Sequence, residues 1–437
     1  MLLLDLTHTS HTQARTGIQR VARQLHAALC AEGGETAICF DPWQKTWRPL
    51  EPWEEKNLTA KAAAASRGAS WPWRARLRGA LRRRLGRTST LNLALSRFDK
   101  LKAPSQSRGS PNGSQLPVLR SLGEEGSAPS SASLLVPEIF SPDVAAALPA
   151  LFAQARGPRT AIFHDAIALK LPELTPVKNV ARFPAYLREL LAFDGIAAIS
   201  EDSRQSLLDY WRWLGVNNPP PVQTIPLGLT LPAPGAERIS NLRSVPRRSR
   251  HQTISNSILC VGSVEGRKNH LALLDACEQL WARGLHFELH LIGLTHPQTG
   301  RAALDKIAAL KGAGRPLRYD GAVDDATVAA AYDACQFTVY PSLMEGFGLP
   351  VLESLAHGKP CVCSSRGALG EATRGGGCVA LDSVDAGSLA AAIMQLLQNP
   401  ASLAALADAA RARIFKSWGN YASELAAWLP TLPRRMK

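Results

Sequence analysis

The chain has 437 residues, of which 46% are hydrophobic and 20% are charged. This composition excludes a mainly disordered chain, a collagen-like chain and a small disulfide-stapled protein. A length of roughly three modal domains predicts at least two domains. The formal net charge is +14, and no run approaches the roughly 20 apolar residues of a membrane-spanning helix. The short apolar run at 2–6 precedes its charges, so we interpret it as a buried strand and not as a signal peptide.

In the first half of the chain, short apolar runs alternate with longer stretches that have helical spacing. Strands are predicted at 2–6, 36–40, 160–165, 195–200 and 222–227. Between the first two, Val21, Leu25 and Leu29 share one face of a predicted helix, and Gly33 ends it.

The positive charge is concentrated in residues 67–108, which carry ten arginines and two lysines against a single acid. A run rich in Ser, Gly and Pro follows, to about residue 133. Segments with few apolar residues and high charge bury too little surface to fold alone. We therefore interpret about 45–133 as a basic insertion in the first domain.

Within that insertion, Trp73, Leu77, Leu81 and Leu85 recur every four residues among arginines. This pattern is typical of a helix that lies on a membrane surface, and anionic lipid is the expected partner of its arginines. The alternative is an arm whose leucine stripe docks on the protein itself. Nucleic acid is not an expected partner, because no nucleic-acid-binding module is recognisable.

In the second half of the chain, short apolar runs and helical stretches alternate more regularly. Strands are predicted at 257–263, 287–293, 317–321, 337–342, 360–365 and 378–382. Strands that are apolar on both faces and separated by helices indicate parallel sheets covered by helices. The fold class is therefore α/β, with two Rossmann-like, doubly wound parallel-sheet domains. Such sheets bind ligands at the carboxyl ends of their strands, so the two sheets are predicted to face a cleft.

The predicted boundaries follow from composition. Residues 1–233 form the first domain, and 234–252, which are rich in Pro, Ser and Arg, form a linker. The second domain covers 253–412, and 413–437 contain a terminal helix.

The most informative loop lies in the stretch YPSLMEGFGLPVLESLAHGKPCVCSS at 340–365. A predicted strand ends near its start, and a helix begins near Leu349, with Pro350 suited to the first turn. Gly346 and Gly348 allow the backbone to approach a ligand closely, and the N–H groups of a helix start attract phosphate. Taken by itself, this pattern fits a structural turn equally well.

The segment EGFGLPVLE forms a complete Glu-x7-Glu element, and it resembles the donor site of family 4 retaining glycosyltransferases, the glycosyl transferases group 1 of the GT-B class. The similarity covers most of 254–420. The resemblance implies that Glu345 contacts the donor sugar from its loop and that Glu353 binds the nucleotide ribose. It also implies that a diphosphate is cradled by the backbone of Phe347, Gly348 and Leu349.

A second element, ILCVGSVEGRKNH at 258–270, contains a buried strand that ends near Gly262. Arg267 and Lys268 follow and are expected to open the next helix. This element resembles the family's cation pair for the pyrophosphate, in the adjacent RKN form of bacterial polysaccharide sugar transferases. A departing nucleoside diphosphate gains negative charge, and no metal-ligand spacing is visible. Fixed cations are therefore expected to stabilise it, with no metal and no cofactor.

The first domain matches the family less closely. His164, in AIFHDAIALKLPE, corresponds to a histidine that faces the donor sugar, and Gly17, in TGIQRV, corresponds to a loop near the diphosphate. The chain departs from the pattern at three positions. Gln19 stands where a second glycine is common, Leu227 replaces a frequent Asn, and Met344 replaces a frequent aromatic residue.

These features predict a retaining GT-B hexosyltransferase that uses a nucleotide-sugar donor. GDP-mannose is the expected donor, ahead of UDP-sugars and dTDP-rhamnose, and the acceptor is a saccharide or a lipid-linked oligosaccharide in cell-surface polysaccharide synthesis. The expected location is the cytoplasm, at the inner face of the cytoplasmic membrane. Two alternatives are a noncatalytic GT-B scaffold at a membrane surface and a GT-B epimerase or phosphorylase.

Overall fold

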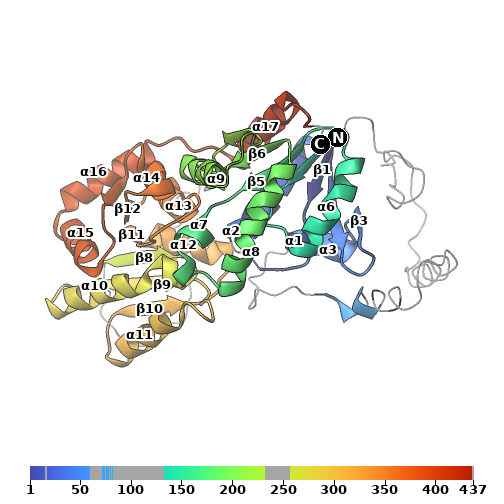
Figure 1. Cartoon of the computed structure of the whole chain (residues 1–437). Helices are drawn as coiled ribbons and strands as arrows, with labels where there is room; N and C mark the ends of the chain where they lie inside the picture. The colour runs from blue at the N-terminus through green and yellow to red at the C-terminus, as the bar shows by residue number, and fades with distance from the viewer. Residues whose placement is uncertain are drawn as a thin grey trace, which may run out of the picture.

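The computed structural model describes residues 1–14, 17–59, 71–73, 75–77, 79, 81, 132–231 and 256–435. The predicted linker and most of the predicted insertion lie outside these residues. Figure 1 shows two α/β lobes, one built from the first half of the chain and one from the second.

The first lobe is a sheet in the order β3-β2-β1-β4-β5-β6-β7, covered by helices. Its strands are β1 (Leu2–Asp5), β2 (Glu35–Asp41), β3 (Thr46–Pro49), β4 (Ser133–Val136), β5 (Arg159–Phe163), β6 (Gly195–Ala198) and β7 (Val222–Thr224). Its helices include α1 (Thr7–Ser10), α2 (Gly17–Glu32), α3 (Pro52–Thr59), α6 (Pro142–Gln154), α7 (Ile167–Lys170), α8 (Val177–Glu189) and α9 (Glu201–Trp213). Every strand pair in this sheet is parallel except β2 with β3.

The second lobe is a fully parallel sheet in the order β10-β9-β8-β11-β12-β13. Its strands are β8 (Ser257–Val261), β9 (Glu288–Ile292), β10 (Leu317–Asp320), β11 (Phe337–Tyr340), β12 (Cys361–Ser364) and β13 (Cys378–Leu381). Its helices include α10 (His270–Ala282), α11 (Arg301–Gly312), α12 (Asp325–Ala334), α13 (Leu349–Ala356), α14 (Gly367–Thr373), α15 (Ala386–Gln398) and α16 (Pro400–Arg411). The predicted α/β class with two parallel-sheet domains is confirmed.

Two strands of the first sheet, β3 and β4, are not among the predicted ones. β3 and α3 lie inside the range that we interpreted as an insertion. The strand β3 was not predicted because this short polar segment contains no apolar run. β4 has four residues, of which Leu134, Leu135 and Val136 are apolar, and it lies directly after the Ser-rich run. Its pairing with β1 and β5 on its two sides buries it at the centre of the sheet.

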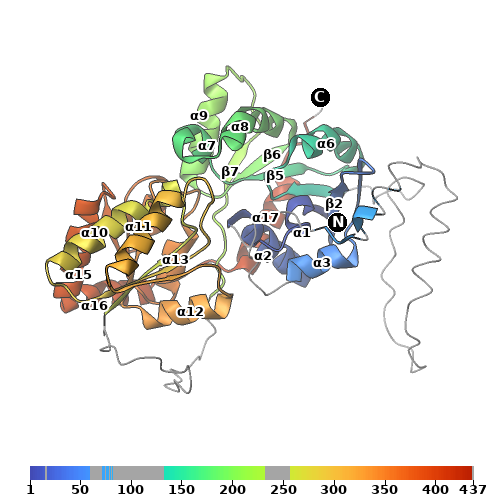
Figure 2. The same cartoon turned by 90° about the horizontal axis from the view of Figure 1, so that it is seen from below.

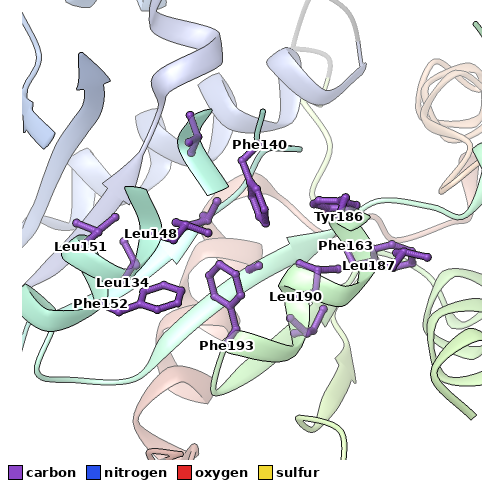
Figure 3. Close-up of a cluster of buried hydrophobic side chains, with 14 of the residues drawn as sticks. Leu134, Phe140, Leu148, Leu151, Phe152, Phe163, Tyr186, Leu187, Leu190 and Phe193 are labelled. Carbon is purple, nitrogen blue, oxygen red and sulfur yellow. The ribbon is translucent and has the colours of Figure 1, made fainter. Parts of the chain in front are cut away.

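An aromatic cluster fills the layer between the first sheet and helices α6 and α8. Figure 3 shows Phe140, Phe152, Phe163, Tyr186 and Phe193 converging there. All five side chains are buried, so this half of the core rests on large rings that pack edge to face and tilted.

The helix α17 (Trp418–Trp428) returns from the second lobe to the first, where it lies beside α2 (Figure 2). Trp418, Tyr421 and Leu425 are buried in one cluster with Leu4 and Val21. The core of the first lobe is therefore built from two distant parts of the chain.

Two findings bear on where function sits. In both sheets the strand order reverses beside the first strand, between β1 and β4 and between β8 and β11. Ligands of such sheets bind outside the carboxyl ends at these reversals. Separately, no single described helix is long and apolar enough to cross a membrane, and α15 with α16 meets the length only as a pair bent by 97°.

Candidate active site

The loop after β11 places Glu345 at the reversal point of the second sheet. Glu345 is buried, and its Oε1 lies 2.5 Å from Lys268 Nζ and 3.0 Å from Arg267 Nη1. The same oxygen accepts hydrogen bonds from the hydroxyls of Tyr340, at 3.0 Å, and Ser342. The sequence suggests a carboxylate exposed to a sugar, whereas in the structure it is the centre of a cationic cluster.

The two cations come from the loop after β8, which neighbours β11 in the sheet. They do not open α10 as expected, because Gly266–Lys268 form a separate 3-10 turn and Asn269 then adopts a left-handed conformation before α10. Arg267 also pairs with Glu265 at 2.8 Å and donates to the Met344 carbonyl at 3.2 Å. The turn thus holds both side chains against the loop after β11.

The charges of this cluster set its protonation states. Burial by itself raises the pKa of Glu345, but the positive charges of Arg267 and Lys268 outweigh it and lower that pKa to about 2. Burial lowers the pKa of Lys268, and Glu345 offsets part of that effect. Burial likewise opposes the charge of Arg267, but Glu345 and Glu265 raise its pKa overall. The carboxylate is therefore ionised at neutral pH.

The start of α13 lies directly after this cluster. Gly348 precedes the helix with φ +93°, a conformation that L side chains rarely adopt. A Cβ there would also lie 3.1 Å from Leu369. Phe347 and Leu349 pack partly into the core, which leaves their backbone as the portion that could meet a ligand. Pro350 has no N–H and the Val351 N–H already donates to the Gly348 carbonyl, so the dipole of this helix start is what suits an anion.

Glu353 lies one turn inside α13 and reaches across the domain boundary. Its Oε1 is 2.5 Å from Nη2 of Arg20 on α2, and the Tyr332 hydroxyl donates to its Oε2 across 3.5 Å. Arg20 carries no signal in the sequence beyond its place in TGIQRV, so its role was missed.

His164 stands at the carboxyl end of β5 and is almost fully buried. Its Nε2 lies 2.7 Å from the Pro137 carbonyl, and burial lowers its pKa, so the ring is neutral at pH 7. The backbone of His164 directly contacts the loop after β11, because a Cβ on Gly346 would lie 2.4 Å from the His164 carbonyl oxygen. The structure therefore brings His164 and the Glu345 loop together.

Two further contacts close the boundary between the domains. The Ser203 hydroxyl on α9 donates to the carbonyls of His164, at 2.8 Å, and Gly346, at 3.3 Å. Glu371 on α14 accepts from the backbone N–H groups of Glu201 and Asp202 at 3.0 and 2.7 Å. A carboxylate of the second domain thus caps α9 of the first, a role with no signal in the local sequence.

The remaining predicted residues lie at the same edges. Gly262 follows β8, and its carbonyl oxygen would be 1.9 Å from a Cβ on Gly293, so the two strand ends pack backbone to backbone. Gly17 is the first residue of α2, and no described side chain or backbone beyond its neighbours comes within 4 Å of a Cβ placed there. Gly17 is therefore open to the space above the sheet.

The first sheet carries its own pair of carboxylates at its reversal point. Asp5 is the last residue of β1 and Glu138 follows β4, and both are buried. Thr7 N–H donates to Asp5 at 2.9 Å, His8 N–H donates to Glu138 at 2.9 Å, and the Thr9 hydroxyl also donates to Glu138. Burial raises the pKa of each to about 7, with mutual repulsion adding to that of Asp5.

In the described part of the basic segment, residues other than the leucines pack against the rest of the protein. Trp71 packs against His11 in a tilted arrangement and against Trp43 edge to face, with ring centroids 4.1 and 4.3 Å apart. Gly79 lies so close to Trp43 that a Cβ would come within 2.6 Å of the ring. In contrast, Trp73, Leu77 and Leu81 are 68%, 52% and 38% exposed.

Two groups of side chains in the described residues have the composition of a metal site, and neither includes a predicted donor-site residue. They are His11, Cys39 and Glu54, and His26, Cys30 and Glu35. Glu54 is held by Arg48 through contacts of 2.7 and 2.8 Å.

Comparison with known proteins places this site in a family. Residues 244–413 match the model of glycosyl transferases group 1. O-antigen chain mannosyltransferase B of Escherichia coli is 30% identical over 266 residues, which are 59% of this chain and 66% of that protein. The MMP alpha-(1->4)-mannosyltransferase of Mycolicibacterium hassiacum is 30% identical over 187 residues, 42% of this chain and 44% of that protein. The chain thus spans two thirds or less of the length of these relatives.

The fold is similar to a solved structure along its whole length. Sucrose-phosphate synthase from Thermosynechococcus elongatus superposes with a TM-score of 0.61 at 18% identity, covering 98% of this chain and 97% of that one. Likeness at this identity supports the two-domain GT-B fold alone. With the matched region and the relatives, it confirms the group 1 part of the resemblance drawn from the Glu-x7-Glu element: residues 244–413 form a glycosyl transferases group 1 domain.

Proposed function

We propose that the protein transfers a sugar from a nucleotide-sugar donor to a saccharide acceptor, with retention of the anomeric configuration. The observation that carries this proposal is the convergence of Arg267, Lys268 and Glu345 beside the start of α13. Two cations and the positive end of a helix dipole suit a diphosphate, and a neighbouring carboxylate suits sugar hydroxyls. The second domain holds the donor, and the first domain holds the acceptor.

The chemistry follows from where charge develops. As the bond to the anomeric carbon breaks, the diphosphate becomes more negative, and Arg267 and Lys268 stabilise it without a metal ion. Both cations contact Glu345 in the free protein, so donor binding exchanges part of that contact for phosphate. His164 and Glu345 then border the transferred sugar. No protein nucleophile is assigned, and the acceptor attacks from the face that the diphosphate leaves.

GDP-mannose is the proposed donor, with UDP-sugars and dTDP-rhamnose as alternatives. The support is the RKN element at Arg267 and two relatives that are named mannosyltransferases, one of them for an O-antigen chain. The proposed acceptor is a saccharide or lipid-linked oligosaccharide of a cell-surface polysaccharide.

A panel of nucleotide sugars tests the donor by thermal shift. A ligand present at about 100 times its Kd stabilises the protein by about 2.7 kcal/mol, so the true donor should raise the Tm clearly. Measuring the slow release of free sugar from each nucleotide sugar of the same panel distinguishes an enzyme from a noncatalytic scaffold. Binding without release of any sugar would favour the scaffold, and epimerised product would favour the epimerase alternative.

We also propose that the protein docks on the inner face of the cytoplasmic membrane through its basic segment. The support is the orientation of that segment, because Trp71 and Gly79 face the protein while Trp73, Leu77 and Leu81 face outward. An exposed apolar stripe within a strongly cationic segment is the composition of an interfacial helix.

Sedimentation with vesicles that contain phosphatidylglycerol tests this docking. Replacing Trp73, Leu77 and Leu81 with Ser should abolish vesicle binding and leave donor hydrolysis intact. Trp213→Ala is the matched control, because Trp213 on α9 is 78% exposed but lies outside the basic segment. Equal vesicle binding by the triple variant and the wild type would reject the membrane surface as a partner.

A further inference from the structure

An ion pair between Arg20 and Glu353 joins the two domains at the place where the nucleotide is proposed to bind. Arg20 lies in the first turn of α2, and Glu353 lies one turn inside α13. The 2.5 Å contact between them spans the domain boundary. It lies beside the loop after β11, which the first domain also contacts through His164 and Ser203.

Glu353 needs a cationic partner because it is buried. Its side chain is only 9% exposed. The Tyr332 hydroxyl, 3.5 Å away, is at the outer limit of a hydrogen bond. Burying a charge without a partner is costly, and a carboxylate held by so little else can turn toward solvent. Arg20 therefore supplies the compensating charge for Glu353 and fixes the direction in which its carboxylate points.

Arg20 does not use up the carboxylate. Two carboxylate oxygens offer about four acceptor positions, more than one guanidinium can fill, and the contact of 2.5 Å joins Arg20 Nη2 to Oε1. The two neighbouring hydroxyls of a ribose can donate to the acceptor positions that remain. Arg20 is also 39% exposed, so its side chain is not sealed inside the domain boundary.

We infer that Arg20 is a positioning residue for nucleotide binding, which holds the Glu353 carboxylate from the opposite domain so that recognition of the ribose requires both domains. The inference rests on the proposed function, in which Glu353 accepts the ribose hydroxyls. It adds that the donor site is completed by the domain that holds the acceptor.

Calorimetry on the full chain with GDP and UDP, each compared with its 2′,3′-dideoxy form, tests this role. Hydrogen bonds to a charged group make the wild type prefer the ribonucleotide by about 10- to 100-fold. Arg20→Ala should weaken ribonucleotide binding about tenfold and shrink that preference to about threefold or less. Binding of the dideoxy form should hardly change. Arg20→Lys should restore part of the preference, and Arg212→Ala, which removes a surface arginine paired with Asp209, should change nothing.

A double variant separates positioning from a general structural effect. In a Glu353→Gln background, Arg20→Ala should have little further effect, because both changes remove the same interaction. Tighter ribonucleotide binding in Arg20→Ala would overturn the inference, since Arg20 would then block the ribose. An unchanged ribose preference would overturn it as well. Failure of the proposed function looks different, because the wild type itself would then bind neither GDP nor UDP.

Discussion

The reversal points of the two sheets both bury carboxylates, but they treat them in opposite ways. At the edge of the second sheet, the charges of Arg267 and Lys268 lower the pKa of Glu345 to about 2. At the edge of the first sheet, burial raises the pKa of Asp5 and Glu138 to about 7, although hydrogen bonds from Thr7, His8 and Thr9 oppose the rise. One edge holds a full charge at neutral pH, and the other favours the neutral form of its carboxyl groups below about pH 7.

This difference suits the two proposed substrates. A nucleoside diphosphate brings negative charge, which needs fixed cations in a site with little water. A saccharide is uncharged, so the proposed acceptor site in the first domain needs oriented hydrogen-bonding groups and no net electrostatic field. Three predictions test this contrast.

The largest effect is expected from the cation pair. Fixed donors near the leaving group act mainly in the transition state, so Arg267→Ala and Lys268→Ala should each lower turnover by about 100- to 1,000-fold. Arg267→Lys should recover only part, because an ammonium lacks the forked geometry of arginine. Initial rates with the identified donor measure this, and chelator should leave them unchanged.

The control for the cation pair is Lys306→Ala, which removes a lysine of α11 that pairs with Glu278 on the surface of the same domain. Thermal unfolding confirms that each variant is folded. Near-normal turnover in the Arg267/Lys268 double alanine variant, or a requirement for Mg²⁺ or Mn²⁺, would contradict the charge-holding role of this edge.

The second prediction concerns pH and stability. Because the folded pKa of Glu138 is above its unfolded value of 4.5, its contribution to stability is complete below about pH 4.5 and is lost as the pH rises through about 7. A shift of this size corresponds to about 3 kcal/mol. Glu138→Gln should therefore gain stability relative to the wild type between pH 5 and pH 8. Urea unfolding at several pH values measures the difference.

Glu345 should show the reverse. Its folded pKa is below the unfolded value, so its contribution is present above about pH 4.5 and is lost as the pH falls toward about 2. Glu55→Gln, which removes an exposed carboxylate of α3, serves as the control for both. If Glu138→Gln keeps the wild-type slope of stability between pH 5 and pH 8, the neutral character of the first edge is refuted.

The smallest effect separates the two carboxylates of the Glu-x7-Glu element. Glu353→Gln should weaken binding of free nucleotide by about tenfold, because the ribose contact exists in the ground state. Glu345→Gln should lower turnover more than nucleotide affinity, because its proposed partner is the sugar. Equal losses of free-nucleotide affinity in both variants would show that this division of roles is wrong.

The sequence predicts which residues meet at the edge of the second sheet, because these residues are local. Glu345, Gly348 and Glu353 lie within one loop and one helix turn, and Arg267 and Lys268 follow a neighbouring strand. Parallel pairing of β8 with β11 is sufficient to bring the two segments together. The direction of Glu345 was not predictable, because it depends on Tyr340 and Ser342 supplying hydroxyls at the same point.

The boundary between the domains is where sequence reasoning fails. Arg20 and Glu371 are ordinary charged residues on helical surfaces, and their partners lie in the other domain. Nothing in their local spacing encodes such a contact, which arises only from how the two domains meet. The strand β4 was missed for a different reason, since three apolar residues after a Ser-rich run are too few to show a clear period.

The return of α17 to the first domain has a consequence for how the protein is made. Trp418 and Tyr421 are buried in one cluster with Val21 and Leu25 of α2. Domains generally fold in order as they leave the ribosome, but this one lacks part of its core until residues 418–428 have been synthesised. The second domain, whose sheet and surrounding helices end by residue 411, can therefore fold to completion before the first.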